Sequence, residues 1–204
     1  MSRPRIAATV GLIATLLAAC NMPGLAISPT PPIVLTQPPF SVENTPMTEV
    51  YNDQRFGMVI NYPQGWTVQE IPLTPETFAG QALEFYSWGF DPLTAGEGAP
   101  NPDQTRVSMI WLGRPDSLDA LAESYLAPIK NPPSGAAPED LITLLAEDRL
   151  TLASGVEAVS VKTHSKFGDT ETILVIINGN GLSLFAQGNP AWLGPMVNTI
   201  RPAP

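Results

Sequence analysis

From Thr48 onward, apolar and polar residues alternate over short stretches that are separated by turn-forming residues. Phe56, Met58 and Ile60 occupy every second position, and residues 62–66 then carry Pro and Gly before another stretch that ends at Ile71. A period of two residues is typical of a β-strand with one buried face. The pattern predicts a hairpin formed by residues 56–62 and 66–71.

The same kind of pattern recurs along the rest of the chain, with breaks rich in Gly, Pro and Asn. Residues 174–177 read Leu-Val-Ile-Ile, which predicts a central strand covered on both faces. Asn and Gly at residues 178–181 tolerate the positive φ of tight turns, so a hairpin is expected there. The further expected strands are residues 82–90, paired with residues 106–112, and then 141–145, 149–152, 156–164, 170–178 and 182–187.

Two segments have a helical period instead. Leu118, Leu121 and Leu126 share one face of residues 117–127, and either Asp116 or Ser117 can cap that helix. A shorter helix is expected between Asn189 and Ile200, with Pro195 limiting its regularity. Hairpins with one helix midway and one at the end predict an α+β fold, a mainly antiparallel β-sheet with flanking helices.

One motif carries a family resemblance. Residues 56–66, Phe-Gly-Met-Val-Ile-Asn-Tyr-Pro-Gln-Gly-Trp, resemble the opening of PsbP-like and Mog-type domains, and Val197 to Arg201 resembles their closing helix end. The resemblance covers residues 48–201 and implies helices around an antiparallel sheet, a PsbP-like sandwich. It also implies an accessory or binding role, because its members include photosystem II accessory proteins, a partner of a nuclear-transport GTPase, and bacterial lipoproteins. It supplies no catalytic motif.

The first twenty residues predict the location. Arg3 and Arg5 precede an uncharged run from Ile6 to Ala19, as in a secretory signal peptide. At 1.5 Å per residue this run spans about 21 Å, which is short for a permanent transmembrane helix. It ends in Leu-Ala-Ala-Cys, which resembles the bacterial lipobox and implies acylation of Cys20 and removal of residues 1–19. The alternative is an ordinary cleaved signal followed by a free thiol.

Residues 20–47 predict a tether. Asn21 to Met47 contain seven prolines, and Glu43 is their only charged residue. Proline favours a semi-extended polyproline II chain, so this segment is expected to space a domain at residues 48–204 away from the bilayer. A Pro-rich ligand for a partner's aromatic groove is the alternative.

Charge and composition argue against several classes of function. The chain holds 10 Lys plus Arg against 19 Asp plus Glu, a net charge of -9, which argues against nucleic acid and against anionic lipid as partners. A membrane location therefore depends on the acyl chains of Cys20. One cysteine and one histidine exclude an intrachain disulfide and a Cys/His zinc site, and no cofactor is expected.

Catalytic signals are weak. His164 is the sole candidate base, and it follows Ser160 and Lys162 on one face of a predicted strand, without a Gly-x-Ser-x-Gly elbow in the chain. Two carboxylate pairs, Glu139-Asp140 and Glu147-Asp148, are adjacent in sequence, so their side chains are expected to point apart. A loop with Asp91, Glu97 and Asp103 lacks calcium-loop spacing. No catalytic or metal-binding residue is predicted.

Aromatic residues give the candidate binding patch. Tyr86 and Trp88 share a strand face with Glu84, and Trp111 lies on the next strand. A sheet packed on both faces explains them, and an exposed groove for a hydrophobic ligand or partner is the alternative. We therefore expect a lipid-anchored extracytoplasmic protein that binds an unknown envelope protein or small ligand without catalysis. A hydrolase using His164 or the acidic pairs, and a passive spacer, are the competing interpretations.

Overall fold

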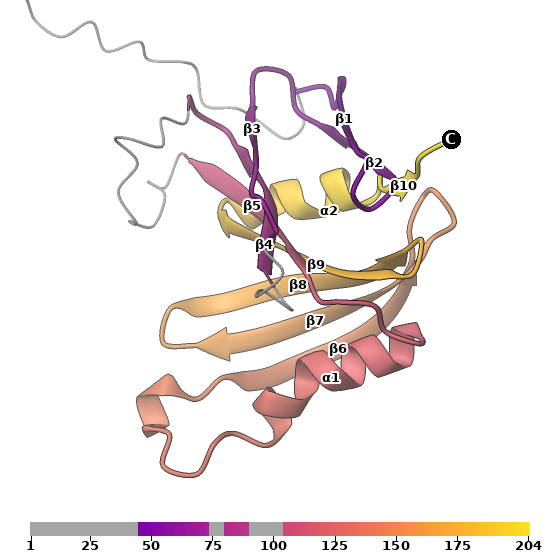
Figure 1. The fold of residues 1–204 in the computed structure, drawn as a ribbon. Coiled ribbons are helices and arrows are strands. Elements are labelled where there is room, and N and C mark those ends of the chain that lie inside the picture. Colours follow the sequence, from indigo (N-terminus) through magenta and orange to yellow (C-terminus); the bar gives the residue numbers. More distant parts are fainter. Residues whose placement is uncertain (1–44, 74–79, 90–103) are drawn as a thin grey trace, which may run out of the picture. The chain divides into compact units, whose positions relative to one another are not determined.

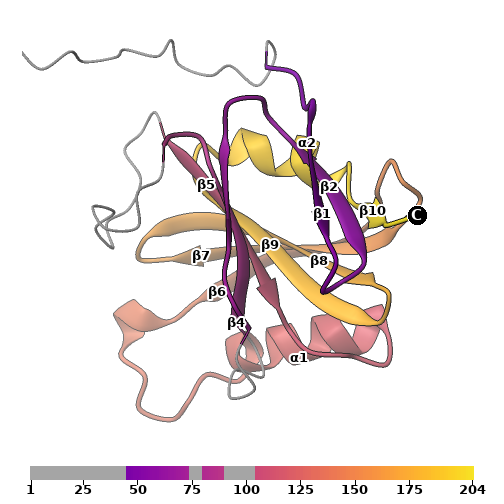
Figure 2. The ribbon, with the colours of Figure 1, turned by 45° about the horizontal axis from the view of Figure 1, so that its top comes forward.

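A computed structural model describes residues 45–73, 80–89 and 104–204 of the chain. These residues form two antiparallel sheets, which can be followed in Figure 1 and, from a second direction, in Figure 2. The smaller sheet has the order β1-β2-β10, from β1 (Glu49–Asp53), β2 (Met58–Tyr62) and β10 (Arg201–Pro202). The larger sheet has the order β3-β4-β5-β9-β8-β7-β6. Its strands are β3 (Thr67–Glu70), β4 (Gly80–Tyr86), β5 (Thr105–Trp111), β6 (Thr143–Thr151), β7 (Glu157–Ser165), β8 (Gly168–Ile177) and β9 (Asn180–Gly188).

Two helices cover opposite faces of the larger sheet (Figure 1). Helix α1 (Leu118–Lys130) packs on β6, β7 and β8, whereas α2 (Leu193–Val197) packs on β9 and on β2 of the smaller sheet. Short 3₁₀ turns, η1 (Pro138–Asp140) and η2 (Pro190–Trp192), precede β6 and α2. The predicted α+β fold with a mainly antiparallel sheet is confirmed.

Helix α1 begins as the sequence predicts and ends later. Ser117 is the N-cap, and its hydroxyl accepts a hydrogen bond from the Ala120 amide at 3.1 Å. The helix continues past Pro128 to Lys130, instead of ending at Ala127. Proline lacks one N–H, and in the last turn this removes a single helical hydrogen bond, so the turn can still form.

The core confirms the prediction for the strand at residues 174–177. Leu174 packs with α1 in a small apolar cluster, and Val175 packs in the main core between the two sheets. Both side chains are fully buried, and β8 lies in the interior of the strand order. A strand covered on both faces needs apolar residues at successive positions, which is the pattern that the sequence shows.

The predicted hairpin of residues 56–62 with 66–71 is wrong. Strand β2 pairs with β1 and β10, and β3 pairs with β4. The turn at residues 62–66 carries the chain from one sheet to the other, with Gly65 at φ 83°. Its Gln64 amide donates to the carbonyl of Pro46 at 3.3 Å, instead of starting a ladder between β2 and β3. Two adjacent strand signals thus belong to different sheets.

Other strand predictions also differ from the structure. Residues 141–145 and 149–152 are expected as two strands, but residues 143–151 form the single strand β6, with a bulge near Leu145. Strands β1 and β10 are not predicted by the sequence pattern, and they complete the smaller sheet. The other expected hairpins form, including β4 with β5 and β8 with β9. Within the described residues, no helix is long and apolar enough to cross a membrane.

Arg55 joins the two sheets. It follows β1 and forms an ion pair at 2.6 Å with Asp53, whose side chain is 1% exposed. The same guanidinium donates to the carbonyls of Ile71 and Ala82 at 2.9 Å, next to β3 and in β4. Burial acts to lower the pKa of Arg55, but the hydrogen bond to Asp53 and the charge of that carboxylate outweigh it and raise the pKa. The contact fixes the smaller sheet over the edge of the larger one.

Candidate functional site

The larger sheet divides at one end, between β8 and β9. Pairing of these strands runs from Ile177 with Asn180 to Thr172 with Phe185 and stops there. Beyond that point, residues 168–171 of β8 continue to pair with β7, and residues 186–188 of β9 continue to pair with β5. We call the gap between residues 168–171 and 186–188 the fork. In antiparallel strands every second residue turns its N–H and C=O to the same side, so both edges direct backbone groups into the fork.

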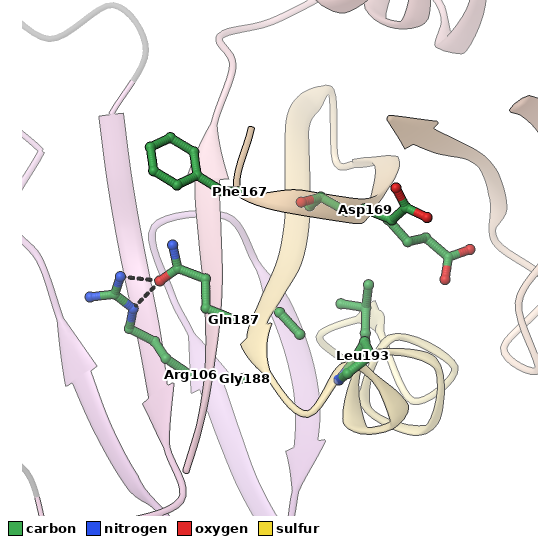
Figure 3. Close-up of a pocket in the computed structure, with 10 residues that line it drawn as sticks. Arg106, Phe167, Asp169, Gln187, Gly188 and Leu193 are labelled. Atoms are coloured by element: carbon green, nitrogen blue, oxygen red, sulfur yellow. Dashed lines mark hydrogen bonds between the residues drawn. The ribbon is translucent and has the colours of Figure 1, made fainter. Parts of the chain in front are cut away.

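A pocket of about 470 Å³ fills the fork. This volume lies within the range of small-molecule binding pockets, about 300 to 1,000 Å³. Figure 3 shows Arg106 and Gln187 on one side of the pocket and Asp169 and Leu193 on the other. We call this the fork pocket; its lining residues come from three strands, the turn after β7 and the C-terminal helical segment: Arg106, Phe167, Asp169, Thr170, Glu171, Ala186, Gln187, Gly188, Pro190 and Leu193.

Arg106 and Gln187 form the polar wall on the β5 and β9 side. They are cross-strand partners, and Arg106 Nε donates to Gln187 Oε1 at 2.8 Å (Figure 3). On its other side, Arg106 Nη1 lies 3.7 Å from Glu84 Oε1, and Glu84 is 4% exposed. Two partners hold the guanidinium in one orientation, so this wall of the pocket is fixed.

Carboxylates form the wall on the β8 side. Asp169 Oδ1 lies 2.6 Å from Nδ1 of His164, its cross-strand partner on β7. Glu171 Oε1 accepts from Ser160 Oγ at 2.6 Å and lies 4.0 Å from Lys162 Nζ. Among the described residues, Asp169 Oδ2 and Glu171 Oε2 have no hydrogen-bond or ion-pair partner. One oxygen of each carboxylate therefore remains available to a ligand.

The rim and floor of the fork pocket are apolar. Phe167, in the turn between β7 and β8, is 89% exposed, and Lys166 Nζ lies 5.2 Å from the centre of its ring. Leu193 and Pro190 contribute the C-terminal segment to the lining, together with Ala186. Gly188 has φ 90°, and a Cβ there would collide with the carbonyl of Gln104, so β9 ends on a residue without a side chain. Aromatic, apolar and charged groups thus face one cavity.

The aromatic residues predicted as a patch do not share one surface. Tyr86 and Trp88 contact each other edge to face at 5.0 Å between ring centres, and Tyr86 is 2% exposed. Trp111 pairs with Gly80 at the far end of the β4–β5 hairpin, and its ring packs against Phe56 on the core side. Alternation along β4 and β5 explains the separation, because Trp111 shares a face with Met109, and Tyr86 shares the opposite one with Glu84.

Tyr86 belongs to a buried polar cluster beside the fork. Its hydroxyl donates a short hydrogen bond to Glu84 Oε2, and Ser108 Oγ donates to Glu84 Oε1 at 3.3 Å. Burial, and next the bond to Glu84, raise the pKa of Tyr86 above its usual value. Since Arg106 also pairs with Glu84, this cluster supports the wall of the fork pocket.

The candidate catalytic groups are dispersed. His164 is exposed and bonds to Asp169, and no hydroxyl of the described residues bonds to it. Glu147 faces Lys130 of α1 at 3.5 Å, and Asp148 turns to the other face of β6, as expected for neighbours in a strand. Asp140 of η1 pairs with Lys166 at 2.6 Å. The described residues hold no group of three or more His, Cys, Asp or Glu side chains suited to a metal ion.

Several predicted residues lie outside the described part of the chain. These are Cys20 with residues 21–44 of the tether, and the acidic loop residues Asp91, Glu97 and Asp103. The residue pattern did not predict the fork pocket, although Ser160, Lys162 and His164 share a predicted polar strand face. A further signal was present: β8 begins with alternating Asp169 and Glu171 before its apolar run, which indicates an end of the strand without an apolar cover.

Comparison with known proteins supports the fold. No protein-family model matches the sequence, and no curated protein matches it. The structure is similar to the solution structure of cyanobacterial PsbP (CyanoP) from Synechocystis sp. PCC 6803, with a TM-score of 0.50 and 11% sequence identity. The match covers 75% of this chain and 91% of that chain. The fold is therefore PsbP-like, as residues 56–66 suggest, and at this identity the likeness concerns the fold alone.

Proposed function

We propose that this protein is a lipid-anchored extracytoplasmic binding module, without a catalytic role, that holds an envelope protein or small ligand in the fork pocket. The carrying observation is the division of the sheet between β8 and β9, which leaves two strand edges and two carboxylate oxygens facing an accessible cavity. A passive spacer does not need this division, because a sheet whose strands pair along their whole length would serve it equally well. The PsbP-like fold supports an accessory role, since the resemblance implies such roles.

Cross-linking inside cells tests the binding role. A photoreactive phenylalanine analogue placed at Gln187 lines the fork pocket, and the same analogue at Glu123 lies on the solvent side of α1. We expect illumination of the source cells to yield a discrete cross-linked species from position 187 and none from position 123. Equal yields at both positions, or none at either, would count against a binding site in the fork.

The anchor rests on the lipobox-like residues 17–20, Leu-Ala-Ala-Cys. Two or more acyl chains give stable anchoring, and the acidic chain adds no attraction to anionic lipid. Intact-mass analysis of the membrane-extracted protein should show acylated Cys20 at the N-terminus. The idea fails if the wild-type protein is secreted unmodified, as the Cys20→Ser variant would be.

A hydrolase is the competing function, and its strongest feature is the contact of His164 with Asp169. A nucleophilic hydrolase also needs a nucleophile within reach of the histidine. Among the described residues, no hydroxyl forms a hydrogen bond with His164. His164→Gln cannot act as a base but can keep a hydrogen bond to Asp169, so it should leave the cellular role of the protein intact. Loss of that role in a folded variant would favour the hydrolase.

A further inference from the structure

We infer, building on the proposed binding role, that the fork pocket takes an extended basic segment of a partner protein, which adds as a short strand to the edge of β8. Three features of the pocket define this ligand: an open strand edge, free carboxylate oxygens, and an apolar rim and floor.

The backbone edge gives the mode of binding. Residues 168–171 pair with β7 on one side only, and the edge toward β9 has no strand partner among the described residues. An exposed strand edge is a template for an extended peptide, whose main-chain groups supply the hydrogen bonds. Four residues of β8 span about 13 Å, so the edge accommodates three or four residues of a ligand.

The closed end of the fork limits the length. From Thr172 and Phe185 onward, β8 and β9 pair with each other, so an added strand cannot continue past that point. A ligand segment must therefore end or turn away at the base of the fork. This favours a chain terminus or a tight loop of the partner over the middle of a long strand.

Charge gives the chemical class. Asp169 and Glu171 are two residues apart on β8, so their side chains share a face, and each keeps one unpartnered oxygen. Their side chains are 74% and 40% exposed, so a ligand can reach them. Arg106 on the opposite wall is already bound by Gln187 and Glu84, which reduces its repulsion of a cation. A Lys or Arg side chain of the ligand fits the two free oxygens.

Phe167 and the floor add apolar contacts. The ring of Phe167 is 89% exposed and already lies beneath the ammonium group of Lys166, which is the geometry of a cation–π contact. On the floor, Leu193 and Ala186 suit a small apolar residue. Both lie on the same face of the sheet as the two carboxylates of β8, so the aliphatic part of a basic side chain also fits them. The ligand residues that alternate with the basic ones point to the opposite face.

Short synthetic peptides and the full-length lipidated protein in detergent micelles test this inference. The probe is a capped hexapeptide that alternates lysine with valine and carries one fluorescent label at one end; its binding is measured by fluorescence anisotropy. A matched peptide replaces lysine with glutamate, and a third is N-methylated at alternate amides, which prevents strand pairing. Hydrogen exchange of the protein amides then locates the bound peptide.

We expect the lysine peptide to bind and to slow amide exchange at residues 168–171. The D169N/E171Q variant should bind the lysine peptide about five- to tenfold more weakly than the wild type does. It removes the two partly exposed charge pairs between these carboxylates and the lysines of the peptide. The control E123Q/E157Q makes the same charge change on α1 and at the far end of β7, and should bind as the wild type does. The glutamate peptide and the N-methylated peptide should each bind at least about tenfold more weakly than the lysine peptide.

Other outcomes overturn the inference. Equal binding of the N-methylated peptide excludes strand addition, and equal loss in both double variants reduces the effect to net charge. Absence of binding by the lysine peptide, with cross-linking from position 187 retained, rejects the basic peptide and leaves the binding role standing. Absence of both rejects the fork as a binding site.

Discussion

At the scale of single residues, Trp66 and Trp111 have different places in the main core. Trp66 is 6% exposed and packs edge to face on Trp192, with ring centres 5.2 Å apart. Trp111 lies at the periphery of the core against Phe56. Neither indole N–H has an acceptor among the described residues. A buried donor without an acceptor costs about 1 to 3 kcal/mol, so part of the packing gain is offset at both positions.

Substitution of these tryptophans should separate packing from the unpaired donor. Trp66→Ala removes a buried ring and is expected to lower the free energy of unfolding by about 3 to 5 kcal/mol. Trp111→Phe keeps a ring and removes the unpaired N–H, so its cost should stay below about 1 kcal/mol. Urea denaturation measures both. A loss below about 1 kcal/mol for Trp66→Ala would show that Trp66 is not a core residue.

Tyr51 predicts an alkaline dependence of stability. Its hydroxyl donates to Glu70 Oε2 at 2.7 Å, and burial, followed by this hydrogen bond, raises its pKa above the usual value of about 10. The folded state thus holds the proton more tightly than the unfolded state does. The stability from this group is complete below about pH 10 and is lost as the pH rises from there towards the folded pKa.

Tyr51→Phe tests that dependence. The variant should be less stable than the wild type by the same amount at about pH 7 and pH 9, since both lie below the titration. Between about pH 10 and pH 11 the difference should shrink, because only the wild type has this proton to release. Urea midpoints across this range measure it. A difference that stays constant up to about pH 11 would contradict the role of Tyr51.

At the scale of elements, the β8–β9 turn connects the two sheets as well as two strands. Asn178 has φ 50° and Gly179 has φ 75°, the conformation of a tight hairpin turn. The Asn178 amide also donates to the carbonyls of Phe56 and Gly57, at 3.2 and 2.7 Å, in the turn between β1 and β2. Asn178 therefore forms part of the turn through its backbone and joins the two sheets through its side chain.

Asn178→Ala should show this double role. It loses the two hydrogen bonds and forces alanine into a positive φ, and we expect about 2 to 3 kcal/mol of destabilisation. Asn178→Gly restores the backbone freedom without the amide, so it should recover about 1 kcal/mol of the loss. Thermal or urea unfolding of the two variants measures the contribution of the amide hydrogen bonds and that of the backbone conformation. Equal stability of the two variants would mean that the backbone conformation contributes nothing.

The sequence predicts local elements better than their partners. The cap at Ser117, the central strand at residues 174–177 and the turn at residues 178–181 follow from local preferences, and they form as expected. The partner of β2 depends on contacts distant in sequence, such as Arg201 with Val59, for which a short pattern holds no signal. The fork pocket is likewise a property of strand pairing, because it depends on where the β8–β9 ladder ends.

At the scale of the whole molecule, the folded part begins before Thr48. The carbonyl of Pro46 accepts a hydrogen bond from the Gln64 amide, and the carbonyl of Met47 accepts one from Asn61 Nδ2 at 3.5 Å. The Met47 side chain also packs against the main core. The tether predicted at residues 20–47 thus includes two residues that contact the domain. The stability of truncated chains can therefore locate the start of the domain.

Two truncated chains define that boundary. A chain that starts at Thr45 keeps the contacts of Pro46 and Met47, and its free energy of unfolding should equal that of the full chain within about 0.5 kcal/mol, the scale of substitutions away from structural contacts. A chain that starts at Thr48 loses two hydrogen bonds and a partly buried methionine, and should be less stable by about 2 kcal/mol. Met47→Ala in the longer chain isolates the side chain and should account for about half of that loss. Equal stability of the two truncated chains would place the start of the domain at Thr48, whereas failure of the Thr45 chain to fold would show that earlier residues are part of it.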